Sequence, residues 1–288
     1  MKNFLNISDL SNQNLRDILN SKTDNSNFLK NKSIGMIFEK YSTRTRLSFN
    51  VGISQLGGNA VDIKFEELNI SRDESFEDTF KAMSCYLDGL VYRTNDHNKL
   101  IQASKYFNKP IINALSNISH PCQVLSDLYT LKEIFNSLEV NILWMGDMNN
   151  VCYSLVETAN IIEELKLTIC SPKEITEKLR WNKSSNVNIV NDISEIDLSL
   201  IDCVMTDVFI SMNDEENVSK VSLLKKYVVN DDLISKTKSN SVFMHCLPAK
   251  VGSEVTKSVF ESSKSIVWKQ AYNRMIAQKK LIQFINWD

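Results

Sequence analysis

The sequence predicts an α/β protein made of two doubly wound domains, each built on a parallel sheet. Short apolar runs alternate with helical patterns along the chain, which is typical of parallel sheets with helices on both faces. The alternation pauses at a polar break, residues 136–139, and then restarts. A length of 288 residues suits two domains of ordinary size. We therefore expect a first domain over residues 1–137 and a second over residues 138–272.

The first half begins with a helical spacing of apolar residues in 4–30, for which Ser8 is the expected cap. Ser42 and Thr43 are N-cap candidates for a helix over 43–56, and Ser75 opens another over 75–86. Pro121 suits the first turn of a helix over 121–135. A further helix is expected over 99–107, a loop over 65–72, and strands over 33–38, 59–64, 89–93 and 110–115.

The second half repeats the alternation. The helical patterns cover 151–165, a segment near Leu223, and an amphipathic stretch of about 271–284. The strands are expected over 140–145, 166–170, 187–190, 201–205 and 241–244.

Composition narrows the function classes. A net charge of −2 argues against nonspecific nucleic-acid binding, which depends on a basic surplus. Six cysteines are scattered without CxxC spacing, so we expect neither a zinc site nor a disulfide framework. The cysteines therefore favour a reducing compartment. The N-terminus lacks the apolar region of a signal peptide, and no apolar run reaches membrane-spanning length. The expected location is therefore the cytoplasm.

Residues 42–46, Ser-Thr-Arg-Thr-Arg, join the first strand to the helix that follows it. Backbone N–H groups at a helix start, hydroxyl donors and guanidinium groups together suit a phosphate or a similar anion. The alternative is an ordinary capped helix with arginines on its solvated face. Gly146, after a later strand, heads no GxGxxG pattern, so a dinucleotide site is poorly supported.

Polar residues follow most of the other strands too, and in open α/β sheets ligands bind beyond the carboxyl ends of strands. Taken singly, each has a plainer explanation: Arg93 as a surface ion-pair residue, His120 as a helix cap, Asp147 as a turn residue, and Cys246 as an inert core thiol. His97 is expected at the surface. Their recurrence in both halves favours a cleft between two domains.

Four motifs together resemble the ornithine carbamoyltransferases. They are Ser42-Thr43-Arg44-Thr45-Arg46, His120-Pro121-Cys122-Gln123, Asp207 with Ser211-Met212, and His245-Cys246-Leu247-Pro248. The first two are similar to elements shared by all carbamoyltransferases. The last two resemble the ornithine branch, since aspartate carbamoyltransferases have another residue in place of the cysteine. The motifs occur in the family's order, and the resemblance covers nearly the whole chain.

The resemblance implies a role for each matching residue. Arg93, His120, Asp207 and Cys246 are the expected catalytic residues. Carbamoyl phosphate is expected to contact Ser42, Thr43, Arg44, Thr45, Asn69, Arg93, His120, Gln123, Cys246, Leu247 and Arg274. Ornithine is expected to contact Asn150, Asp207, Ser211 and Met212. Asn69 replaces a glutamine that the family commonly supplies from a neighbouring subunit, and Asn213 replaces the glycine of a Ser-Met-Gly motif.

The resemblance also implies an assembly and a reaction. The first domain would bind carbamoyl phosphate, the second ornithine, and a final helix, about 273–288, would pack back on the first domain of a homotrimer. The expected reaction carbamoylates the δ-amine of L-ornithine, giving L-citrulline and phosphate for arginine biosynthesis, with no metal or cofactor, no nucleic acid and no membrane. The alternatives are another amine substrate, such as putrescine or an acylated ornithine, and a non-catalytic carbamoyltransferase-like binding protein.

Overall fold

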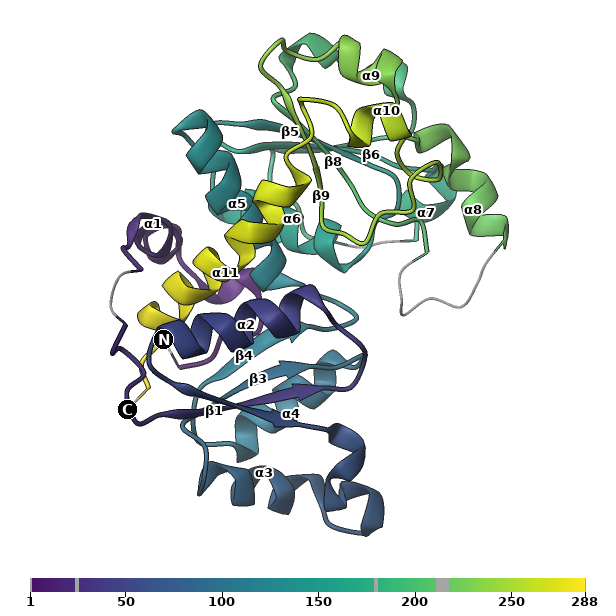
Figure 1. Ribbon diagram of the computed structural model, residues 1–288. Coiled ribbons are helices and arrows are strands. Elements are labelled where there is room, and N and C mark those ends of the chain that lie inside the picture. The colour runs from purple at the N-terminus through teal and green to yellow at the C-terminus, as the bar shows by residue number, and fades with distance from the viewer. Residues whose placement is uncertain (1, 24–25, 179–180, 211–217, 288) are drawn as a thin grey trace. The chain divides into compact units, whose positions relative to one another are not determined.

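The computed structural model of the chain describes residues 2–23, 26–178, 181–210 and 218–287 (Figure 1). The chain divides into two compact units, one of Met1–Ser126 with Asn273–Asp288 and the other of Asp127–Tyr272. Each unit contains one parallel sheet, which confirms the predicted fold class. None of the described helices is long and apolar enough to span a bilayer.

The sheet of the first unit has the strand order β2-β1-β3-β4 and is parallel throughout. Its strands are β1 (Ser33–Phe38), β2 (Asn59–Ile63), β3 (Gly89–Arg93) and β4 (Ile111–Leu115). Helix α2 (Arg44–Gln55) lies on one face, and α3 (Phe76–Ser84) and α4 (His97–Tyr106) lie on the other (Figure 1). The core on the α3 and α4 side joins Phe80, Leu90, Tyr92 and Leu100.

The final helix also packs on the first unit. Helix α11 (Val267–Phe284) carries Lys279, whose Nζ donates to Gln55 Oε1 at the end of α2 (3.0 Å). Lys280 donates to the backbone oxygens of Leu19 and Ser21, at the C-terminus of α1 (Asn12–Asn20). A cation suits this position because the last carbonyls of a helix have no partner within it.

The sheet of the second unit has the order β7-β6-β5-β8-β9, also parallel. Its direction of winding reverses between β5 and β8, the kind of point where ligands bind in open α/β sheets. The strands are β5 (Asn141–Met145), β6 (Lys166–Cys170), β7 (Val187–Val190), β8 (Cys203–Thr206) and β9 (Val242–His245). The helices are α5 (Pro121–Phe135), which enters from the first unit, α6 (Asn150–Ile161), α7 (Lys173–Thr176), α8 (Val218–Leu224), α9 (Asp231–Ser235) and α10 (Lys257–Phe260).

Several local predictions were wrong. The cap of α1 is Ser11, which accepts from Asn14 N, and Ser8 lies in a separate 3-10 turn, Ile7–Asp9. The expected loop over 65–72 contains two 3-10 helices, Phe65–Glu67 and Asn69–Arg72. Thr43 occupies the N-cap position of α2 in a helical conformation, and its side chain makes no cap hydrogen bond.

Candidate active site

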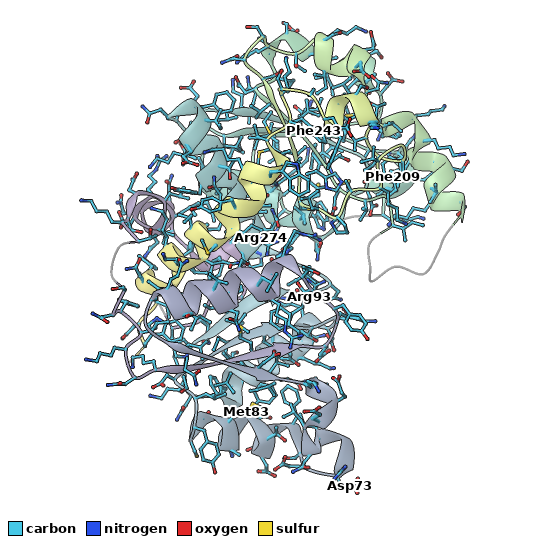
Figure 2. The ribbon with its side chains drawn as sticks, in the orientation of Figure 1. Asp73, Met83, Arg93, Phe209, Phe243 and Arg274 are labelled. Atoms are coloured by element: carbon cyan, nitrogen blue, oxygen red, sulfur yellow. The ribbon has the colours of Figure 1, made fainter. Side chains whose placement is uncertain are left out.

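The carboxyl edge of the first sheet gathers the residues that were expected to bind an anion. Strands β1, β3 and β4 are neighbours, and the turn before α2, Arg93 and the loop leading to His120 follow their ends. Arg93 of β3 and Arg274 of α11 both lie by the N-terminal end of α2 (Figure 2). Segments more than 200 residues apart in the sequence thus supply one cluster.

The start of α2 is suited to an anion. Since the Thr43 side chain does not cap the helix, it leaves the first-turn N–H groups and the positive end of the helix dipole without that partner. The two arginines of this turn have different roles. Arg46 forms an ion pair with Asp62 and lies over the Phe38 ring, whereas Arg44 is close enough to Arg93 to lower its pKa. Arg44 is therefore the arginine of this turn that belongs to the cluster.

Arg274 organises two neutral side chains of the cluster. Its Nη1 donates to Gln123 Oε1 (2.6 Å), and its Nη2 donates to Thr45 Oγ1 (2.7 Å). All three residues are at most 3% exposed. Because Thr45 Oγ1 accepts from Arg274, its hydroxyl hydrogen can point toward a ligand, and the same guanidinium fixes the orientation of the Gln123 amide.

Arg93 is buried, being 5% exposed, so its interpretation as a surface ion-pair residue was wrong. Burial, followed by the nearby charges of Arg274 and Arg44, lowers its pKa to about 10. Its Nε is buried and has no hydrogen-bond partner among the described residues. A buried donor without a partner is costly, and so is the repulsion between like charges, and a bound anion would relieve both costs.

His120 lies beside these arginines and is 5% exposed. Burial first, and then the charges of Arg274 and Arg93, lower its pKa well below 6.5. Its imidazole is therefore neutral at pH 7 and can donate one hydrogen bond without adding a charge. The cluster as a whole offers charged donors for a phosphate and neutral donors for a polar group beside it.

The second unit has its own cluster, at the ends of β5, β8 and β9. Asp207 is 9% exposed, and its Oδ2 accepts from Asn149 Nδ2 (2.6 Å). Asn149 also caps α6, where its Oδ1 accepts from Val151 N and Cys152 N. Asn149 was not among the predicted site residues, although a cap directly before a helix is a recognisable signal; Asn150, which was, is the first residue of α6.

Cys246 lies beside Asp207. One ligand-type atom each from Asp207, His245 and Cys246 lies within 4.8 Å of the others. Cys246 is partly exposed, so its interpretation as an inert core thiol was wrong. Such a donor set can also bind a metal. However, His245 Nδ1 accepts from Leu247 N (2.9 Å) and Nε2 lies 3.1 Å from Glu254 Oε1, so both ring nitrogens already have partners.

The contacts of His245 fix the loop that follows it. Glu254, which was not predicted as a site residue, is fully buried and accepts from Lys250 N (2.5 Å) as well as contacting His245. Leu247 adopts φ +57°, a left-handed conformation that is unfavourable for a leucine, and a cis peptide precedes Pro248. The hydrogen bonds of His245 and Glu254 thus hold the backbone on both sides of Cys246 and Leu247.

The remaining predicted residues lie elsewhere. Asn69 is exposed on its 3-10 helix, next to Asp73, which lies well away from Arg93 (Figure 2). Asp147 is 6% exposed and pairs with Lys220 (2.8 Å), so it is more than a turn residue. Ser211 and Met212 lie outside the described residues, and Ser42 is partly exposed in the turn before α2.

His97 was wrongly expected at the surface. It is 6% exposed, and its Nδ1 lies 2.8 Å from Ser116 Oγ. Its backbone N–H donates to Asn117 Oδ1 (2.9 Å). His97 therefore supports the loop that leads to His120.

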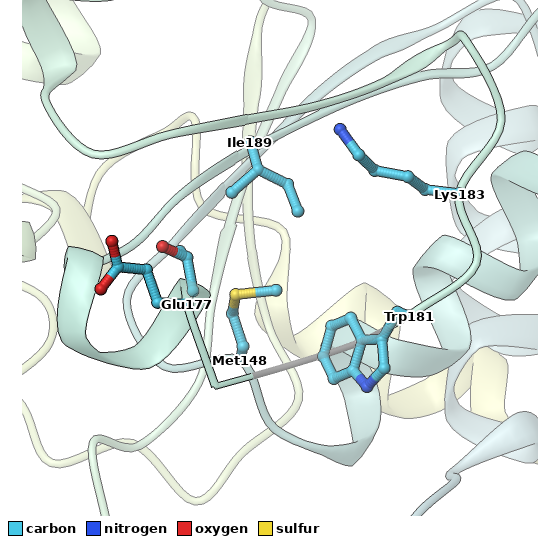
Figure 3. Close-up of a pocket in the computed structure, with 6 residues that line it drawn as sticks. Met148, Glu177, Trp181, Lys183 and Ile189 are labelled. Carbon is cyan, nitrogen blue, oxygen red and sulfur yellow. The ribbon is translucent and has the colours of Figure 1, made fainter.

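The second unit also contains a pocket of about 290 Å³ (Figure 3). Its lining residues are Met148, Thr176, Glu177, Trp181, Lys183 and Ile189. None of these lining residues is a predicted site residue, and Met148 directly precedes Asn149 in the sequence.

Comparison with known proteins agrees with this geometry. Residues 2–133 match the family model "Aspartate/ornithine carbamoyltransferase, carbamoyl-P binding domain", and residues 138–285 match the "Asp/Orn binding domain" of the same family. The ornithine carbamoyltransferase of Methanosphaera stadtmanae is 38% identical, over 99% of both chains. Two crystal structures of ornithine carbamoyltransferases have a TM-score of 0.88. The Burkholderia thailandensis protein is 31% identical and covers 99% of this chain and 98% of its own. The anabolic Campylobacter jejuni protein is 32% identical and covers 98% of each. The chain therefore belongs to the aspartate/ornithine carbamoyltransferase family.

Proposed function

We propose that this protein transfers the carbamoyl group of carbamoyl phosphate to the δ-amine of L-ornithine, giving L-citrulline and phosphate. The observation that carries the anion half of this proposal is a cluster of three arginines: the buried Arg93 and Arg274 lie beside a neutral His120, and the partly buried Arg44 lies close to Arg93. The observation that favours an amine acceptor is Asp207, a carboxylate beside Cys246 at the end of β8. A carboxylate there suits the cationic side chain of ornithine better than the anionic side chain of aspartate.

The first unit would bind carbamoyl phosphate. Arg44, the N–H groups at the start of α2 and the hydroxyls of Ser42 and Thr43 would hold the phosphate. Thr45, Arg93 and His120 would donate to the carbonyl oxygen and stabilise the negative charge that develops there when the amine attacks. This charge is the feature of the transition state that the cluster is suited to stabilise.

The attacking amine must first lose a proton. An alkylamine has a pKa of about 10.4 in water, so it is mostly protonated at pH 7. Asp207 and Cys246 would orient this amine and assist the loss of its proton, with Asn150, Ser211 and Met212 as proposed contacts to the rest of ornithine. The amine nitrogen then forms a bond to the carbonyl carbon, the C–O bond to phosphate breaks, and phosphate leaves with the bonding electron pair.

We also propose a homotrimer, in a reducing cytoplasm, that serves arginine biosynthesis. Tyr41, Leu47 and Val51 are 94%, 59% and 41% exposed, and Leu47 and Val51 are one turn apart on α2. Such an apolar face suits a subunit contact. The position of Asn69, away from the cluster of its own chain, fits a role in a neighbouring subunit. The six cysteines, all of them among the described residues, are not paired in disulfides, which is compatible with a reducing compartment, and the Campylobacter jejuni relative is named as anabolic.

A substrate panel tests the reaction. Purified protein with carbamoyl phosphate is given L-ornithine, putrescine, an N-acylated ornithine or L-aspartate, and each carbamoylated product is quantified. We expect citrulline from ornithine, with kcat/KM at least 100-fold above that for the other acceptors. Faster carbamoylation of putrescine would assign the second substrate site to another amine. Binding of carbamoyl phosphate without any product would indicate a non-catalytic relative.

A further inference from the structure

Glu39, the first residue after β1, has a carboxylate that contacts three side chains beyond its own strand. Its Oε1 accepts from Tyr92 Oη (2.6 Å), and its Oε2 accepts from Thr94 Oγ1 (2.9 Å). Lys99 Nζ of α4 lies 3.1 and 3.2 Å from the two oxygens. The Glu39 side chain is only 11% exposed, so these contacts are largely shielded from water. Charge-assisted hydrogen bonds in such a place are short and directional.

Tyr92 and Thr94 are the two neighbours of Arg93 in the sequence. Side chains alternate across a strand, so residues 92 and 94 point to one face of the sheet and Arg93 points to the other. Tyr92 packs against Phe80 of α3 (ring centroids 5.9 Å apart), whereas Arg93 faces the cluster with Arg44 and Arg274. Glu39 binds both neighbours on the face of the sheet opposite to Arg93, and it thereby fixes the direction in which Arg93 points. Its backbone N–H also donates to Arg93 O (3.1 Å).

The support on the opposite side of β3 is irregular. Tyr92 pairs with Asn113 of β4, but Arg93 pairs with Leu115, so the register shifts between these two positions. Such bulges interrupt the ladder of hydrogen bonds and often redirect a side chain next to a functional site. Because the hydrogen-bond ladder between β3 and β4 is interrupted at Arg93, the position of Arg93 depends more on the contacts that β1 and Glu39 make with β3.

We propose that Glu39 is a positioning residue for carbamoyl phosphate: it joins the end of β1, where the turn of residues 42–46 begins, to the two neighbours of Arg93. This proposal rests on the proposed function, since it takes Arg93 and the turn as the anion site. Without the Glu39 carboxylate, the end of β1 and the turn of residues 42–46 could move away from the end of β3, which carries Arg93. The donors would still be present, but they would no longer be directed at one point.

The test compares Glu39→Gln with Asp88→Asn. Asp88 joins the same two strands at their other ends, where its Oδ2 accepts from Ser33 N (2.8 Å) and Lys32 lies 3.8 Å away. Both substitutions remove one carboxylate charge between β1 and β3. For Glu39→Gln we expect the KM for carbamoyl phosphate to rise at least tenfold, with the KM for ornithine changed less than threefold. For Asp88→Asn we expect both constants to stay within twofold, even where the two variants lose similar thermal stability.

Calorimetry with inorganic phosphate separates this proposal from the proposed function. If wild-type protein binds phosphate and forms no citrulline, but Glu39→Gln binds phosphate at least tenfold more weakly, the proposed function is wrong and the role of Glu39 stands. If Glu39→Gln does not fold, Tyr92→Phe, which removes one donor and keeps the ring, should still weaken phosphate binding about threefold. Binding within twofold of wild type in the folded variant, or an equal loss in Asp88→Asn, would overturn the proposal.

Discussion

Replacement of Arg274 by methionine should weaken carbamoyl phosphate binding severely. The variant loses the charge of Arg274 and both of its hydrogen bonds, 2.6 Å to Gln123 Oε1 and 2.7 Å to Thr45 Oγ1, which orient two donors of the site. A hydrogen bond to a charged group contributes about 1.5–3 kcal/mol. If the ligand loses two such contacts, at the lower figure, the cost is about 3 kcal/mol, or roughly 100-fold in Kd.

Lys279→Met is the matched control. Lys279 lies on the same helix and donates to Gln55 Oε1 (3.0 Å), so it also ties α11 to α2, but at the other end of α2. It is 9% exposed, and the same residue type replaces it. Calorimetry with carbamoyl phosphate should give a Kd within threefold of wild type for Lys279→Met. Arg274 does not have this role if Arg274→Met also binds carbamoyl phosphate within threefold of wild type, or if Lys279→Met loses as much affinity.

Three further predictions concern other parts of the molecule. Asp207→Asn should lower kcat for citrulline formation about 10²–10⁴-fold through loss of the base, while the Kd for carbamoyl phosphate stays within threefold. An unchanged kcat would remove Asp207 from the chemistry. Burial and two neighbouring arginines lower the pKa of His120 well below 6.5, so the unfolded chain takes up this proton at a higher pH than the folded chain does, and the free energy of unfolding should fall as the pH drops below 6.5. In urea titrations between pH 7 and pH 5, His120→Gln should lose less stability than wild type, and an equal loss would contradict the lowered pKa. Leu47→Glu with Val51→Lys should convert a trimer of about 99 kDa, three chains of 33.0 kDa, into monomers in light scattering, whereas a wild-type monomer would refute the trimer.

Much of the fold could be predicted because parallel strands are marked by short apolar runs. The predicted bounds of β1, β3, β6 and β7 agree with the structure to the residue. Three helices of four or five residues, α7, α9 and α10, were missed because such lengths are too short to show a helical period. The cap of α1 was misplaced because Ser8 and Ser11 are equally plausible from local sequence.

The candidate site was predictable where it follows strand ends and unpredictable where it depends on register. Arg93 could be identified from its place at a strand end and His120 from its motif, but their burial and their shared environment with Arg274 depend on how α11 packs. Glu39 gave no signal, because its partners become apparent only when β1 is aligned with β3. His97 was misjudged for the same reason, since the loop that covers it lies about 20 residues further along the chain.

Transfer of a labelled carbamoyl group tests the central claim most directly. Wild-type protein is incubated with L-ornithine and carbamoyl phosphate that carries ¹³C at its carbonyl, and carbon and phosphorus NMR spectra are recorded together. The proposed reaction predicts that the label appears in the ureido carbon of citrulline, with one phosphate released for each citrulline formed. Release of phosphate at the rate of the protein-free control, with no labelled citrulline, would contradict it.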